Sequence, residues 1–224
     1  MNIQMRGTTA EVLLYEDIGG WFGITADAFI REIKKINDVS TINLRINSNG
    51  GNVFDGVAIY NYLKAHKARV EVDIDGIAAS IASIIALAGD EVRMADNAWY
   101  MIHDPWIQTG GTAQHLRKTA DTLEGVRDTL LDTYMAKAQA SRDVISDMMT
   151  EETWLNAKDA AEYGFVDSVT ADLQIAAHVH KEWFKHPPQA LIEAPKQEPK
   201  QAPQHALVKQ IIARQGQTLR RLKI

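Results

Sequence analysis

The chain contains no cysteine, and this absence excludes several kinds of protein. It can form no disulfide bond, no thiolate nucleophile and no zinc site with cysteine ligands. The first residues, MNIQMRGTTAEV, lack a basic segment followed by an apolar one, so we expect no secretory signal. The small and apolar stretch at 75–89 is shorter than the roughly 20 residues that span a bilayer. We therefore expect a cytoplasmic protein without a membrane partner.

Basic residues are concentrated at the carboxyl end, although the formal net charge of the chain is −5. Seven Lys or Arg residues and one Glu follow residue 195, so this end carries about +6 and the remainder about −11. Residues 184–205 are rich in Pro, Gln, Ala and Lys, which is typical of an extended linker. We therefore predict a folded domain over 1–183, a linker over 184–205 and a basic helical tail over 206–224. The tail has no aromatic residue to stack on bases, which disfavours nucleic acid as its partner.

Short strands and helices alternate through the first hundred residues. Helices are predicted after the capping residue Thr25 and over 54–66. This alternation favours α/β architecture, with βαβ units around a largely parallel sheet and function at the carboxyl ends of its strands. Alternating apolar residues predict strands at 11–15, 41–47, 69–74, 91–94 and 98–102.

A long helix is predicted over 112–140, where Leu116, Leu123 and Leu130 recur every seven residues. Such a stripe is usually intramolecular core, although a helix of this length can also pack against a neighbouring subunit. Asn156 is expected to cap a short helix that Gly164 ends, and residues 165–169 to form a last strand.

Ser80 lies where a strand is expected to give way to a short buried helix, and Ser83 lies inside that helix. The free N–H groups and positive dipole of a helix start would favour an oxyanion beside the Ser80 hydroxyl. Ser80 could instead be a plain N-cap or close-packing residue. The segment by itself does not decide between these interpretations.

Two further places follow predicted strands. The pair Gly50-Gly51 would let the backbone approach a ligand closely, although a tight turn is the simpler explanation. No Lys-Ser/Thr follows at phosphate-loop spacing, which excludes that motif. His103 ends an apolar strand beside Asp104 and Pro105, where a structural histidine or a catalytic one would both fit.

Three carboxylates, Asp147, Glu151 and Glu152, could orient an imidazole or be solvated charges at a helix end. Serine is a poor nucleophile unless a histidine takes its proton and a carboxylate fixes the histidine tautomer. A serine, a histidine and an acid are therefore what acyl transfer needs. The residues alone indicate a possible serine hydrolase.

Four ordered segments together resemble the ClpP-type serine peptidases. INSNGGNV at 46–53 resembles their INSPGG segment, and GIAASIAS at 76–83 resembles their nucleophile segment. MIHDP at 101–105 resembles their MIHQP segment, and AAEYGFVDS at 160–168 resembles an acidic stretch near their carboxyl end. The resemblance implies a ClpP/crotonase-like spiral of βαβ units, with a long helix that mediates assembly into homo-oligomeric rings and, here, an extended C-terminal tail.

The resemblance also implies roles for individual residues. Ser80 would be the nucleophile and His103 the general base, with the N–H groups of Gly51 and Ile81 as the oxyanion hole. The aspartate of the family falls on Glu152, whose extra methylene changes its reach, so Glu151 and Asp147 remain alternatives.

A polypeptide substrate would add as a strand beside the segment after the glycine pair. Residues Gly50, Asn52, Val53 and Phe54 are therefore the expected substrate-binding residues. The resemblance implies no metal and no cofactor.

Within the family, the INSNGG segment, the ETW at 152–154 and the basic tail are most similar to phage and prophage head maturation proteases. Such an enzyme would cleave capsid and scaffold proteins in the host cytoplasm, inside the prohead, with capsid, scaffold or portal proteins as partners. Cellular ClpP usually has an amino-terminal axial loop, which we cannot place in MNIQMRGTTA. The alternatives are a housekeeping ClpP-like peptidase that works with an ATPase, a crotonase-fold acyl-CoA enzyme, and an inactive structural or scaffold protein.

Overall fold

The structure is a computed structural model that describes residues 1–192 except 21–22, 37–38 and 174–178. The chain divides after Glu193 into two units, and the described residues belong to the first. The predicted basic helix over 206–224 and most of the predicted linker lie outside the described residues.

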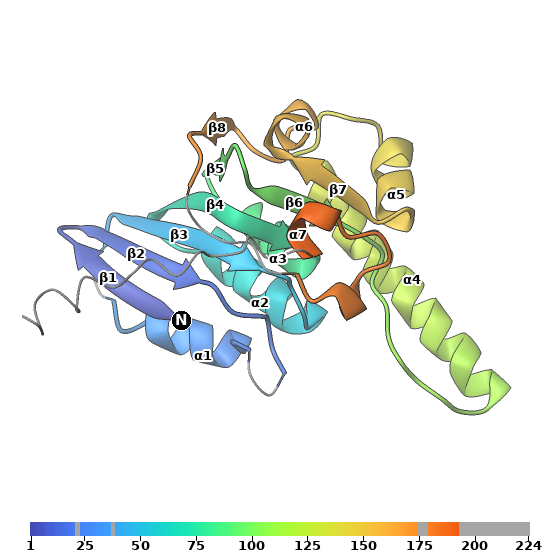
Figure 1. The fold of residues 1–224 in the computed structure, drawn as a ribbon. Coiled ribbons are helices and arrows are strands. Elements are labelled where there is room, and N and C mark those ends of the chain that lie inside the picture. Colours follow the sequence, from blue (N-terminus) through green and yellow to red (C-terminus); the bar gives the residue numbers. More distant parts are fainter. Residues whose placement is uncertain (21–22, 37–38, 174–178, 193–224) are drawn as a thin grey trace, which may run out of the picture. The chain divides into compact units, whose positions relative to one another are not determined.

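An eight-stranded, largely parallel sheet forms the centre of the domain (Figure 1). Its main path runs β1-β2-β3-β4-β5-β8, while β6 pairs with β4 and β7 pairs with β6. All pairs are parallel except β1 with β2 and β6 with β7. The predicted α/β architecture is therefore confirmed. The strands are β1 (Asn2–Arg6), β2 (Thr9–Leu14), β3 (Thr41–Ser48), β4 (Arg69–Ala79), β5 (Glu91–Ala95), β6 (Trp99–Ile102), β7 (Thr153–Asn156) and β8 (Ser168–Thr170).

The helices cover the sheet, and α1, α2 and α3 lie together on one face (Figure 1). The side chains of Thr25 and Asn156 cap α1 and α6 as predicted, by accepting the backbone N–H groups of Ala28 and Asp159. The helices are α1 (Ala26–Ile33), α2 (Val53–Lys64), α3 (Ile81–Ala86), α4 (Ala113–Met135), α5 (Arg142–Thr150), α6 (Ala157–Glu162) and α7 (Gln189–Ile192), with a 3₁₀ turn, η1, at Lys181–Trp183. None of the helices in the described ranges combines the length and the apolar character that crossing a bilayer requires.

Strand β4 is longer than predicted, because the strand expected to end at Ile74 continues to Ala79. Up to Ile74 it pairs with β5, whereas residues 77–79 pair with β6 instead. From Ile74 to Ala79 every residue is buried, so the alternation that marks a half-exposed strand disappears there. With β6 as its new partner, β4 continues to Ala79, the residue directly before Ser80.

Helix α4 ends at Met135, five residues before the predicted end. Its leucine stripe is buried only toward the carboxyl end, since Leu130 is 5% exposed and Leu116 is 43% exposed. The amino-terminal half of the helix projects from the body of the domain (Figure 1). Its apolar residues are therefore available to a partner. The last predicted strand is also displaced, from 165–169 to 168–170.

Residues 179–192, which we call the strap, cross the ends of β4 and β6 (Figure 1, orange to red). Val179, Phe184 and Leu191 are buried there in a small cluster with three residues of those strands: Ile77, Ala79 and Met101. The boundary that we placed between residues 183 and 184 thus falls inside a packed segment. The strap brings the chain back to the carboxyl ends of the central strands.

Candidate active site

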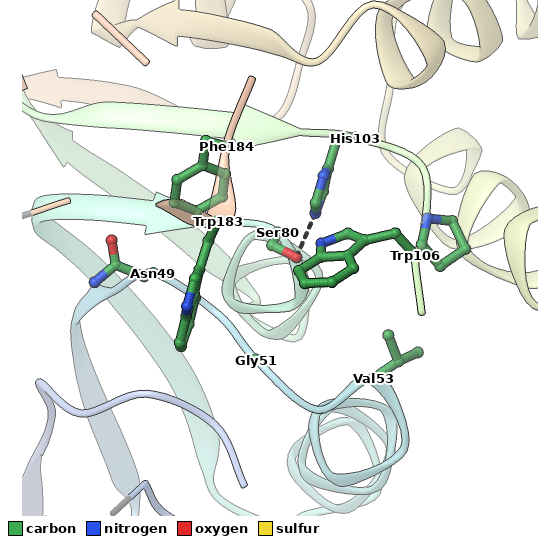
Figure 2. Close-up of a pocket in the computed structure, with 9 residues that line it drawn as sticks. Asn49, Gly51, Val53, Ser80, His103, Trp106, Trp183 and Phe184 are labelled. Carbon is green, nitrogen blue, oxygen red and sulfur yellow. Dashed lines mark hydrogen bonds between the residues drawn. The ribbon is translucent and has the colours of Figure 1, made fainter. Parts of the chain in front are cut away.

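Ser80 occupies a strained turn between β4 and α3. Its φ is +55° and its ψ is −129°, a conformation that costs a residue with a side chain on the order of 1–3 kcal/mol. Although Ser80 is at the N-cap position, its side chain caps nothing, and its Oγ lies 2.7 Å from His103 Nε2 (Figure 2). A strained serine at a strand-to-helix turn is the arrangement of a nucleophile elbow. This geometry favours the catalytic interpretation of Ser80 over the capping one.

Hydrogen bonds on both sides hold the strained turn. The Ser80 N–H donates to the Met101 carbonyl at 3.0 Å, and the Ser80 carbonyl accepts the N–H of Ser83 at 3.0 Å. Ser83 Oγ donates to the same carbonyl at 2.5 Å and lies 2.7 Å from the hydroxyl of Tyr134, on α4. Ser83 is fully buried. It is therefore a positioning residue behind Ser80, and it links the nucleophile to the long helix.

Gly50 and Gly51 lie where no side chain fits. A Cβ on Gly50 would lie 2.6 Å from the Ala79 carbonyl oxygen and 2.8 Å from Ser80 Cβ. A Cβ on Gly51 would lie 2.2 Å from the Ile18 carbonyl oxygen. The glycine pair is thus more than a tight turn, because it lets the end of β3 pack directly against the nucleophile.

Two backbone N–H groups beside Ser80 are available to a ligand. Within the part of the chain that the structure describes, the N–H groups of Gly51 and Ile81 donate no hydrogen bond. Ile81 is the first residue of α3, where N–H groups have no partner within the helix. Its nitrogen lies 3.1 Å from the position that a Gly50 Cβ would take. Donors placed in this way can stabilise the negative oxygen of a tetrahedral intermediate.

His103 directly follows β6 and is only partly accessible. Burial lowers the pKa of its imidazole below the usual 6.5, while the charges of Glu152 and Asp104 raise the pKa by less and Lys185 lowers it. The imidazole is therefore neutral at pH 7 and can accept the Ser80 proton.

Glu152 is buried, with 5% of its surface exposed, and the strap covers it. Its Oε2 accepts the N–H of Lys185 at 2.8 Å, and its Oε1 accepts the N–H of His186 at 2.7 Å. Trp154 Nε1 donates to Oε1 at 3.3 Å. Among the described residues no hydrogen bond joins this carboxylate to His103. Its charge nevertheless acts on the imidazole.

The other two predicted acids, Asp147 and Glu151, lie at the surface. Both are exposed, and neither lines the hollow that Glu152 shares with His103. Asp104 is adjacent to His103 in the chain, but its carboxylate forms an ion pair with Arg127 at 2.7 Å. Of the three predicted candidates, only Glu152 is buried beside the histidine.

A cleft of about 320 Å³ opens at Ser80. Figure 2 shows Trp183 and Phe184 of the strap on one side of the serine and Trp106 on the other. A neighbouring hollow of about 340 Å³ lies between the start of α2 and α4 and includes Phe54 and Ile107. The cleft at Ser80 is lined by Asn49, Gly51, Val53, Ser80, His103, Pro105, Trp106, Trp183 and Phe184.

The expected substrate-binding segment requires a correction. Residues 52–54 do not form a strand edge, because Asn52 caps α2 and Val53 begins the helix. The Ile18 N–H also donates to the Gly50 carbonyl, and the Ile18 carbonyl accepts the Asn52 N–H. A substrate strand therefore cannot pair with residues 52–54 as it would with an extended sheet edge. Val53 lines the cleft, while Phe54 is 70% exposed in the neighbouring hollow.

The strap was not predicted to be part of the site. Trp183 and Phe184 line the cleft, and Lys185 and His186 bind Glu152 through their backbone. The Pro- and Gln-rich composition that follows indicated a linker. The one sequence pattern that could have indicated a packed segment was the adjacent aromatic pair, Trp183 and Phe184, because an extended linker does not need large apolar side chains.

Comparisons with known proteins agree with this geometry. The sequence model of the Clp protease family matches residues 25–172. The chain is 34% identical over 142 residues to the ATP-dependent Clp protease proteolytic subunit of Streptococcus pneumoniae strains Hungary19A-6 and CGSP14, covering 58% of this chain and 69% of each relative. The solved structure of a ClpP1 point mutant from Listeria monocytogenes superposes with a TM-score of 0.63 at 26% identity, covering 72% of this chain and 91% of that one.

The family match contains the glycine pair, Ser80, His103 and Glu152, and it ends before the strap. Members of the family bind polypeptide substrates and form homo-oligomeric rings. With two thirds of the sequence matched and the fold shared, the chain belongs to the Clp protease family of serine peptidases.

Proposed function

We propose that this chain is a serine endopeptidase in which Ser80 is the nucleophile, His103 the general base and Glu152 the acid. The observation that carries the proposal is the 2.7 Å contact between Ser80 Oγ and His103 Nε2 at a strained turn. The N–H groups of Gly51 and Ile81, which donate to no other described residue, support the assignment of an oxyanion hole beside that turn.

Each step of peptide hydrolysis has a group in position. His103 Nε2 takes the Ser80 proton as Oγ attacks the substrate carbonyl carbon, and the oxyanion is held by the Gly51 and Ile81 N–H groups. The imidazolium then protonates the leaving amine, which departs and leaves an acyl-enzyme. A water molecule, deprotonated by His103, hydrolyses this ester and restores Ser80. Glu152 stabilises the imidazolium through its charge.

Exposed apolar residues beside the cleft and on α4 support assembly of this chain into a homo-oligomeric ring. Phe54, Trp106 and Ile107 line the neighbouring hollow, Leu116 lies on the projecting half of α4, and each is more than 40% exposed. Apolar side chains gathered in this way usually mark an interaction site. Another copy of the chain would cover the projecting half of α4.

For the biological setting we propose maturation of a phage prohead, in the host cytoplasm, with capsid, scaffold or portal proteins as substrates or partners. The INSNGG segment and the basic tail support it. The names of the pneumococcal relatives favour a second candidate, a housekeeping peptidase that requires an ATPase. Incubation of the purified chain with capsid and scaffold proteins, with and without a Clp ATPase and ATP, separates the two. Cleavage without the ATPase supports the phage role, and strict dependence on it supports the housekeeping role.

Two other candidates predict no peptidase activity. A crotonase-fold acyl-CoA enzyme does not need the Ser80–His103 pair, and an inactive scaffold protein does not need either residue. The family match and the contact between the two side chains oppose both.

The activity itself is tested by hydrolysis of a fluorogenic peptide. Ser80→Ala should lower the rate by several orders of magnitude while the protein remains folded, because removing a triad member leaves only about 10³–10⁴-fold catalysis over water. Ser40→Ala, at an exposed serine outside the cleft, is the matched control and should retain full activity. Undiminished hydrolysis by a folded Ser80→Ala variant would refute the assignment.

A further inference from the structure

The strap contributes to the catalytic cleft although it lies beyond the family match, which ends at residue 172. Trp183 and Phe184 form one side of the cleft, opposite Trp106 (Figure 2). The other lining residues come from the family-matched domain. This wall of the cleft therefore comes from residues outside the family match.

The strap is attached on both sides of the cleft. Near the end of β3, the His180 N–H donates to Asn49 Oδ1 at 3.3 Å, and His180 Nε2 lies 3.1 Å from Asp17 Oδ2. At the other side, Glu152 accepts the N–H groups of Lys185 and His186. The residues between these two attachments, including Trp183 and Phe184, are thereby held over the ends of β4 and β6.

Buried apolar contacts fix the wall between the two attachments. Phe184 is 9% exposed, and its ring packs edge-on against that of Trp154 at 5.2 Å between centroids. It also lies 6.1 Å from the His103 ring. The Trp183 ring packs against His180 at 4.7 Å and is only partly buried, so one side remains open to the cleft. Ser80 itself is not covered, because it still lines the open cleft.

We infer that Trp183 and Phe184 determine substrate specificity, by forming an aromatic wall that selects a large apolar side chain at the residue whose carbonyl Ser80 attacks. The inference rests on the proposed peptidase function. A cleft of about 320 Å³ is at the low end of ligand pockets, roughly 300–1,000 Å³, and suits a single large side chain. Trp106, Pro105 and Val53 complete an apolar lining, and aromatic faces favour an aromatic or long aliphatic guest.

The experiment compares kcat/KM for two peptidyl-aminomethylcoumarin substrates that differ only in Phe or Ala before the scissile bond. The wild type should prefer Phe, and Trp183→Ala should lower the Phe-to-Ala ratio about tenfold, which is the scale of losing one apolar contact in a binding pocket. Tyr62→Ala removes a partly buried aromatic ring at the far end of α2 and should leave the ratio unchanged.

Leu191→Ala tests the placement of the wall without altering a lining residue, since Leu191 is buried in the strap but outside the cleft. It should lower the ratio in the same direction as Trp183→Ala. An unchanged ratio in both variants would overturn the inference, as would equal acceleration of both substrates, which would show that the strap blocks the cleft. If the wild type hydrolyses neither substrate, the proposed function has failed instead.

Discussion

Replacing Glu152 by Gln should separate two roles of this side chain, because it removes the charge and preserves the shape. The carboxylate accepts two strap N–H groups and the Trp154 indole. The amide nitrogen of Gln accepts nothing, so either the Lys185 or the His186 N–H loses its partner. The hydrogen bonds that remain are then accepted by a neutral amide oxygen instead of a charged carboxylate.

The magnitude follows from these contacts. A hydrogen bond to a charged group contributes about 1.5–3 kcal/mol, and a neutral one about 0.5–1.5 kcal/mol. Losing one bond and weakening another at this buried site should lower the free energy of unfolding by about 2–4 kcal/mol. For a domain of this size the melting temperature should fall by about 4–16 °C. Thermal unfolding followed by circular dichroism measures this change.

The pH profile reports on the second role. Since the negative charge of Glu152 raises the pKa of His103, Glu152→Gln should lower that pKa further below 6.5. Neutral His103 then persists to lower pH, so the acid limb of kcat/KM should move to lower pH while the plateau falls. Glu152→Asp keeps the charge and should move the limb much less. The exposed Glu151→Gln is the matched control, and an unmoved limb in Glu152→Gln, or a larger effect from Glu151→Gln, would refute the assignment of the acid.

The remaining predictions concern the support of the nucleophile, the assembly and the tail. Ser83→Ala should leave the buried Tyr134 hydroxyl without its partner and lower kcat with little change in KM, as well as costing about 1–3 kcal/mol in urea unfolding; unchanged kcat would contradict the positioning role. The wild type should be an oligomer by light scattering at micromolar concentration, and Leu123→Asp on α4 should dissociate it; a monomeric wild type would contradict the assembly. Removal of the residues after Ile192 should leave small-peptide hydrolysis intact but impair incorporation into proheads, whereas loss of hydrolysis would show that those residues belong to the catalytic fold. The wild type should also show self-cleaved species by intact mass that Ser80→Ala lacks.

Local patterns were sufficient where a single element decides the structure. The alternation in β3 and the caps at Thr25 and Asn156 were predicted correctly, because each depends on neighbouring residues only. The prediction that Ser80 and His103 follow strands was also confirmed. Parallel strands end at the same edge of a sheet, which is why residues 23 positions apart meet there.

Patterns failed where a distant partner decides. Strand β4 continues past Ile74 because β6 replaces β5 as its neighbour. No local sequence pattern indicates this change of partner. The strap has the composition of a linker, yet Phe184 and Leu191 pack against an apolar surface and its backbone N–H groups bind Glu152. The start of α2 was predicted to within one residue, whereas the extended substrate-binding segment that the resemblance implied at 52–54 was wrong, because Asn52 caps the helix that begins at Val53.

Covalent labelling with a fluorophosphonate tests the central claim most directly, because the reagent reacts with a serine only where a base and an oxyanion hole activate it. The wild-type protein should be labelled at a single residue, Ser80, identified by mass spectrometry of its peptides. Ser40→Ala should be labelled equally and Ser80→Ala not at all. Labelling of folded Ser80→Ala at the wild-type rate, or no labelling of the wild type, would contradict the account.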